Sequence, residues 1–126
     1  MSLRSPLGRI RGLGPAHEGA SHWWMQRLTA LALIPLVLWF VTSMAGLARA
    51  DYDVVVAWAS RPLVSVLMLT LILAGFYHLK LGLQVVIEDY IHDRFLKMTA
   101  QVAVIFFSFT TAIACLFAVL KLALGN

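Results

Sequence analysis

Ionisable side chains interrupt the end of a long apolar stretch, in the segment YHLKLGLQVVIEDYIHDR at residues 77–94. His78 stands among apolar residues, and Glu88, Asp89 and Tyr90 follow one another further along. In a helix that turns about 100° per residue, His78 and Asp89 differ by about 20° around the axis and by about 16 Å along it. The two side chains therefore share a face. A neutral imidazole on such a face suits axial ligation of haem iron.

Two glycines flank this histidine on the same stripe of the expected helix. Gly82 follows His78 by four residues, about 40° around the axis, and Gly75 precedes it by three. Positions without a side chain give a flat, bulky ligand room to approach the imidazole. The spacing leaves a second interpretation open, in which His78 makes a hydrogen bond to another helix.

The composition decides in which solvent the chain folds. Of its 126 residues, 61% are hydrophobic and 13% charged, with a mean hydropathy of +0.86, whereas soluble domains are about half apolar and about a quarter charged. The apolar residues form three blocks, from about Met25 to Leu47, Pro62 to Ile87 and Met98 to Leu124. Each block reaches the length of about 20 residues that a membrane helix needs. Three segments are too few to close a β-barrel. We therefore predict an all-α integral membrane protein with three spans.

The segments outside the blocks are short. We expect a cytoplasmic amino-terminal arm at residues 1–24 and a single membrane domain at residues 25–126, with connections at 48–61 and 88–97 that hold no second domain. The arm is basic and suited to a partner or to lipid headgroups, and it offers little support for a targeting presequence. Pro35 should bend the first span.

The basic residues predict the orientation of the spans. Six lie around the amino end and the second connection, and three lie on the other side: Arg4, Arg9, Arg11, Arg27, Arg94 and Lys97 against Arg49, Arg61 and Lys121. Cytoplasmic segments are the richer in Lys and Arg, so the amino terminus should be cytoplasmic and the carboxy terminus outside. Trp23, Trp24 and Trp58 would then mark the two interfaces, and this topology explains the net charge without nucleic acid.

This topology places His78 deep in the membrane. It lies ten residues before Glu88, about 15 Å from the cytoplasmic boundary and near the middle of the hydrocarbon, where an ionisable group marks a functional site by default. Lys80 lies about 200° around the helix from His78 and should face away from any ligand there. Thr29 and Gln84 are expected to make hydrogen bonds between helices.

The remaining polar residues have simpler interpretations. His22 and His92 lie at the expected cytoplasmic interface, where solvated boundary residues are usual. Cys115 is the single cysteine and falls inside the third span, so no disulfide or cysteine metal site is available and a packing role is expected. The sequence shows no Gly-rich phosphate loop and no nucleophile triad.

Residues in the first and second spans match the pattern of a known family. The pattern H-x3-G-x6-D-Y at His78, Gly82, Asp89 and Tyr90, together with HWWMQRLTA at the start of the first span, resembles the small D-type membrane-anchor subunits of succinate dehydrogenase, respiratory complex II. The resemblance covers roughly residues 20–97, and the three-span topology extends it over nearly the whole chain.

The resemblance implies a role for each matching residue. His78 falls on the axial ligand of haem b, whose second axial histidine comes from the larger anchor subunit, and Gly82 lies beside it. Arg27 matches an arginine near a haem propionate, a role that suits a bidentate guanidinium. Asp89 and Tyr90 match the pair beside the ubiquinone site, where the Tyr hydroxyl donates a hydrogen bond to a quinone carbonyl.

The resemblance also implies partners. The chain alone should catalyse nothing, because the FAD and the iron-sulfur clusters would lie on a flavoprotein subunit and an iron-sulfur subunit. It would anchor the complex in a bacterial inner membrane, with a mitochondrial inner membrane the less expected location, and electrons would pass to ubiquinone near Tyr90.

Two other classes remain open at the level of sequence. One is the membrane anchor, with or without haem, of another quinone-linked dehydrogenase or of a fumarate reductase. A cytochrome that holds its own haem usually needs a second intramembrane histidine, and the sequence has none at comparable depth. The other is a noncatalytic membrane helper subunit in which His78 and Lys80 serve packing or an ion path.

Overall fold

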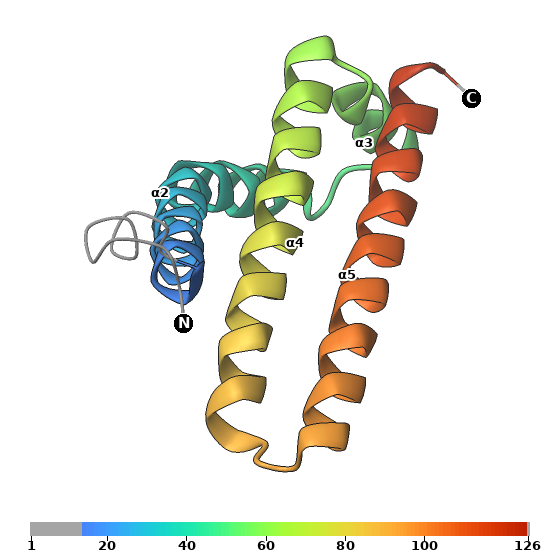
Figure 1. Ribbon diagram of the computed structural model, residues 1–126. Helices are drawn as coiled ribbons and strands as arrows, with labels where there is room; N and C mark the ends of the chain where they lie inside the picture. Colours follow the sequence, from blue (N-terminus) through green and yellow to red (C-terminus); the bar gives the residue numbers. More distant parts are fainter. Residues whose placement is uncertain (1–13, 126) are drawn as a thin grey trace, which may run out of the picture.

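The chain folds into helices that are joined by short turns (Figure 1). The computed structural model describes residues 14–125, and within them the helices are α2 (Gly14–Leu47), α3 (Tyr52–Ala59), α4 (Pro62–Tyr90) and α5 (Arg94–Ala123), with no strand. Helices α2, α4 and α5 are each long and apolar enough to cross a membrane. The prediction of an all-α protein with three spans is therefore confirmed.

The helices extend beyond the apolar blocks from which they were predicted. Helix α2 begins at Gly14, so residues 14–24 of the expected arm continue the first span as helix, while residues 1–13 lie outside the described part. Helix α5 begins at Arg94, because the Asp93 carboxylate caps it by accepting a hydrogen bond from the Leu96 amide at 2.8 Å. Hydropathy identifies the apolar part of a helix, whereas the capping residue determines where the helix begins.

Helix α3 occupies the connection that the sequence left without structure. Its Trp58 ring stacks on Trp39 of α2, with centroids 5.9 Å apart and planes 24° apart. The hydroxyl of Ser60, which follows α3, lies 2.7 Å from the Val56 carbonyl and 3.0 Å from the Leu122 carbonyl in α5, so its one proton is shared between α3 and α5. These contacts fix α3 against the ends of two spans, and Pro62 then opens α4 at a position where its missing amide proton costs nothing.

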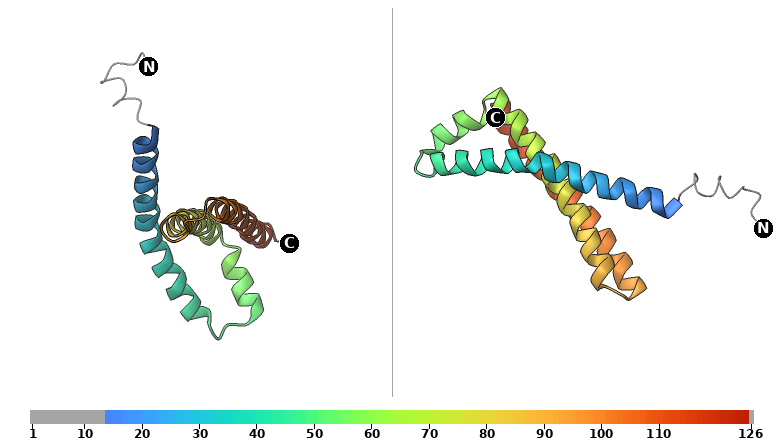
Figure 2. Two further views of the ribbon diagram at one scale, coloured as in Figure 1. Left: turned by 60° about the horizontal axis from the view of Figure 1, so that its bottom comes forward. Right: turned by 90° about the vertical axis from the view of Figure 1, so that its left-hand side faces the viewer.

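Helix α4 is the centre of the arrangement. Helix α5 runs antiparallel beside it, and α2 crosses it on the opposite side, so that α4 lies between the other two (Figure 2). Helix α2, which contains Pro35, changes direction near its middle (Figure 2). Few side chains are buried within the chain, as expected for a protein whose apolar surface faces lipid or other subunits.

Candidate functional site

His78 lies where α2 crosses α4. We call this crossing the α2–α4 seam and define it by Gln26, Thr29 and Leu33 on α2 and by Gly75, His78 and Gly82 on α4. The two helices run antiparallel, so the seam has three levels. A Cβ atom added to Gly82 would lie 3.6 Å from the Gln26 Nε2 atom, and one added to Gly75 would lie 3.9 Å from Leu33 Cδ2. His78 faces Thr29 between these levels.

The glycines of the seam therefore serve the approach of α2. Sequence reasoning left the space beside Gly82 to a flat ligand, and the structure places the side-chain amide of Gln26 there. Small residues at a helix crossing let two backbones approach closely, which is the usual basis of helix association in membranes. The stripe of small residues was visible in the sequence, but its partner on α2 was not.

A hydrogen bond joins the middle level of the seam. The Thr29 Oγ1 atom lies 2.9 Å from Nδ1 of His78, and Thr29 is only 8% exposed. The prediction that Thr29 bonds to another helix is confirmed. The contact uses one nitrogen of the imidazole, so it is compatible with a ligand on the other nitrogen.

The second ring nitrogen of His78 is open. Within residues 14–125 no hydrogen bond reaches Nε2. Two polar side-chain atoms of these residues are enclosed without a hydrogen-bond partner, Gln26 Oε1 and Ser108 Oγ, and Nε2 is not one of them. The described residues form no cluster of three or more potential metal ligands. His78 is thus a single donor that presents one free nitrogen at the surface of the chain.

An apolar groove borders the seam one helical turn from His78. It has a volume of about 360 Å³ and lies between α2 and α4 around Gly75, with Leu33, Val37 and Phe76 among its walls. His78 itself does not line this groove.

Arg27 is not part of the seam. It precedes Thr29 by two residues, about 200° around α2, so it lies on the side away from His78. Its guanidinium carbon stands 5.2 Å from the centre of the Trp23 ring, and the side chain is exposed. This cation–π contact leaves the guanidinium donors available to an anion outside the chain.

Asp89 and Tyr90 end α4, well away from the seam. Both are exposed, and Tyr90 is 78% exposed. At 1.5 Å per residue they lie about 16 to 18 Å along the helix from His78, with Asp89 on the same side of the helix as the imidazole. The structure therefore separates the predicted residues into two places, the seam and the end of α4.

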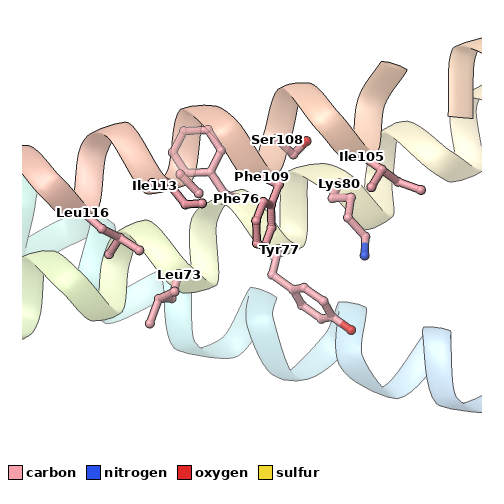
Figure 3. A pocket seen from close by; sticks show the side chains of 10 residues that line it. Leu73, Phe76, Tyr77, Lys80, Ile105, Ser108, Phe109, Ile113 and Leu116 are labelled. Atoms are coloured by element: carbon pink, nitrogen blue, oxygen red, sulfur yellow. The ribbon is translucent and has the colours of Figure 1, made fainter. Parts of the chain in front are cut away.

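The opposite side of α4 carries a second pocket, at the contact with α5 that we call the α4–α5 seam. The pocket has a volume of about 340 Å³ and is lined mainly by apolar residues, with Lys80 and Tyr77 at one end and Leu73 and Leu116 at the other (Figure 3). The Lys80 Nζ atom lies 5.2 Å from the centre of the Tyr77 ring. Lys80 faces away from His78, as the helical angle predicted.

Sequence reasoning did not include Gln26 among the site residues. Gln26 precedes Thr29 by three residues and therefore shares its face of α2, which is the signal that identifies it in retrospect. Its Oε1 atom is enclosed and has no hydrogen-bond partner among the described residues. A buried amide oxygen in this state marks a position that suits a further donor.

The sequence is similar to a known protein family and to several named proteins. Residues 1–117 match the family described as "Succinate dehydrogenase/Fumarate reductase transmembrane subunit". A succinate dehydrogenase hydrophobic membrane anchor subunit from Rickettsia bellii is 34% identical over 93% of this chain and 94% of its own length. The protein of the same name from Paracoccus denitrificans is 28% identical over 99% and 96%. No solved structure gives a significant match.

Proposed function

Because this chain belongs to the succinate dehydrogenase/fumarate reductase transmembrane subunit family, we propose that it helps to bind haem b and forms part of the ubiquinone-reduction site of a succinate dehydrogenase. It is a multi-pass membrane protein, and its relatives are named as hydrophobic membrane anchor subunits of that enzyme. Succinate oxidation, the flavin and the iron-sulfur clusters belong to partner subunits in this proposal. The single cysteine, Cys115, cannot ligate a cluster by itself.

The state of the two His78 ring nitrogens carries the proposal. Thr29 contacts Nδ1, and Nε2 has no hydrogen-bond partner among residues 14–125, in the middle of a membrane helix. An imidazole that is hydrogen-bonded at one nitrogen and open at the other is the arrangement that metal-binding histidines adopt. A single donor from this chain would fit haem if a partner subunit contributes a further ligand, as the resemblance implies. When bound, the haem would supply a one-electron store.

Arg27 and Gly82 have supporting roles in this proposal. The exposed guanidinium of Arg27 has planar paired donors that suit a propionate, but it lies on the side of α2 away from His78, so its contact with the haem stays a prediction. Gly82 lets α2 approach at the level below His78. Its direct contact with the haem stays a prediction.

Tyr90 and Asp89 form the quinone end of the proposal. The exposed Tyr90 hydroxyl is free to donate a hydrogen bond to a quinone carbonyl oxygen, and the Asp89 carboxylate tunes the local field or assists proton delivery. We place this end of α4 on the cytoplasmic side of a bacterial inner membrane. Electrons from the iron-sulfur subunit and protons from water then reach the same place.

The haem role is tested on the purified complex with all its subunits. We expect a b-type band in the reduced-minus-oxidised optical spectrum that weakens or shifts in His78→Ala. The matched control is His92→Ala, because His92 is an exposed histidine just beyond α4. An unchanged band in His78→Ala, or no band in the native complex, would remove His78 as a ligand.

The quinone role is tested with Tyr90→Phe, which removes only the hydroxyl. We expect succinate-dependent reduction of ubiquinone to fall by about tenfold to a hundredfold, as for the loss of one donor to an oxygen that gains charge. Tyr52→Phe is the control, because Tyr52 is equally exposed, at 78%, but lies in α3. Succinate oxidation with an artificial acceptor should stay unchanged in both. Equal ubiquinone rates in the two variants would refute the role of Tyr90.

A further inference from the structure

The Thr29 hydroxyl has three hydrogen-bond neighbours but only one proton to donate. We propose that Thr29 is the positioning residue that holds His78 in the tautomer with the proton on Nδ1 and thereby keeps Nε2 available as a ligand. The inference rests on the proposed role of His78 as a haem ligand. It concerns a residue to which the resemblance assigned no part in the haem site.

The distances around the Thr29 hydroxyl decide where its proton goes. The Oγ1 atom lies 2.7 Å from the Met25 carbonyl oxygen, 3.1 Å from the Gln26 carbonyl oxygen and 2.9 Å from Nδ1 of His78. A hydroxyl has one proton to donate and two lone pairs that accept. A carbonyl oxygen only accepts. The hydroxyl must therefore donate to the Met25 carbonyl, as helical threonines commonly do to the residue four positions earlier.

This direction of the hydroxyl fixes the state of the imidazole. With its proton on the Met25 carbonyl, the Thr29 oxygen accepts, so the Nδ1 atom of His78 must donate. A neutral imidazole has a proton on one nitrogen and a lone pair on the other. The Nε2 atom then carries the lone pair that binds a metal. In the opposite tautomer, two lone pairs would face each other 2.7 Å apart, between the hydroxyl and the Met25 carbonyl.

The contact also fixes the orientation of the ring. Thr29 is 8% exposed and β-branched, so its side chain has little freedom in a helix. Because the ring is tied to α2 through Nδ1, the Nε2 atom points in one direction relative to the crossing of the two helices. An acceptor on Nδ1–H raises the basicity of the other nitrogen and so favours the ferric state of a bound iron.

The experiment compares haem potentials in the purified complex with its haem bound. Thr29→Val keeps the shape and removes the hydroxyl, and Thr29→Ser keeps the hydroxyl. The matched control is Thr42→Val, because the Thr42 hydroxyl on the same helix donates to the Leu38 carbonyl at 2.6 Å and has no hydrogen bond to a histidine among the described residues. The readouts are the redox titration of the b-type band and the electron paramagnetic resonance spectrum of the ferric haem.

We expect Thr29→Val to raise the ratio of ferrous to ferric haem about tenfold at a fixed ambient potential, a shift of about 59 mV for one electron. The ferric spectrum should change with it. Thr29→Ser should restore both readouts toward the native values, and Thr42→Val should leave them unchanged. If Thr29→Val does not assemble with haem, Thr29→Ala takes its place, because it lacks the hydroxyl and needs less space.

The outcomes separate this inference from the proposed function. A native potential in Thr29→Val or Thr29→Ala overturns the inference, while the haem role of His78 stands if His78→Ala still loses the band. A Thr29→Ser variant as shifted as Thr29→Val would also overturn it, because packing rather than the hydroxyl would then matter. An unchanged band in His78→Ala would instead overturn the proposed function on which the inference rests.

Discussion

The two sides of α4 are built on different principles. On the α2 side, glycines bring the helices close together, and a buried threonine holds the histidine at 2.9 Å. On the α5 side, a pocket of about 340 Å³ lies among large apolar side chains, and the buried Ser108 Oγ has no partner among the described residues. One side holds the imidazole by a hydrogen bond at a close helix crossing, and the other side has no such bond in its pocket among the described residues. Each side also encloses one oxygen without a partner among those residues, Gln26 Oε1 on the α2 side and Ser108 Oγ on the α5 side.

This difference follows from the way helices associate in a membrane. Lipid is as apolar as leucine, so burial of apolar surface contributes little to association, and close packing and hydrogen bonds become decisive. The α2–α4 seam uses both of these and can therefore position a ligand group. Helices α4 and α5 are joined by a short turn at residues 91–93. This covalent connection keeps the two helices side by side even where their side chains leave a pocket.

The largest effect should come from filling the glycine positions of the α2–α4 seam. In Gly82→Leu and Gly75→Leu the Cβ atom alone would lie 3.6 Å from Gln26 Nε2 and 3.9 Å from Leu33 Cδ2, so the longer side chain must displace these α2 side chains or, at Gly75, enter the neighbouring groove. Overpacking of about 1–3 kcal/mol should push α2 away and separate Thr29 from His78. We expect the haem content of the purified complex to fall strongly.

The controls for this prediction lie on the same helices. Gly82→Ala and Gly75→Ala should keep most of the haem, because 3.6 and 3.9 Å are ordinary contact distances. Gly46→Leu in α2 should also keep it, because nothing lies within 4 Å of an added Cβ there. Full haem content in both leucine variants of the seam would show that α2 does not need its close approach. Loss of haem in Gly82→Ala alone would instead indicate that the haem touches this glycine.

The sequence predicted the elements of the seam but not their pairing. Three apolar blocks and the stripe of glycines around His78 follow from periodicity within one segment, so they were readable. The pairing of Gln26 with Gly82 depends on where two helices that are far apart in the sequence cross. The periodicity of a single sequence does not reveal this crossing point. Helix α3 was missed for a related reason, since its stacking of Trp58 on Trp39 is a tertiary contact.

A smaller effect is expected from the other side of α4. Lys80→Met removes a cation that lines the α4–α5 pocket and rests on Tyr77. The haem content should stay native, because no part of the α2–α4 seam changes. Loss of a positive charge stabilises ferric haem, so the haem potential should fall or stay constant. At a fixed ambient potential the ratio of ferrous to ferric haem should change by less than about tenfold.

The sign of this change separates the two sides. Thr29→Val should raise the potential, whereas Lys80→Met should lower it if it acts at all, and a redox titration of the b-type band measures both. Lys121→Met is the control, because Lys121 is an exposed cation at the far end of α5. A raised potential or lost haem in Lys80→Met would mean that the α4–α5 seam also positions the ligand.

The smallest effect should come from the hydroxyls of two buried serines. The Ser108 Oγ atom, at 3% exposure, has no partner, so Ser108→Ala removes an unsatisfied group and should leave stability unchanged or slightly raised. The Ser65 hydroxyl, at 6% exposure, shares its one proton between the Ala59 and Arg61 carbonyls, each 3.0 Å away, so Ser65→Ala should cost about 1 kcal/mol. Thermal loss of helical circular dichroism in the detergent-solubilised complex measures both. Equal destabilisation would mean that Ser108 has a hydrogen-bond partner in the complex, and the α5 side would then hold a bonded hydroxyl, as the α2 side does at Thr29.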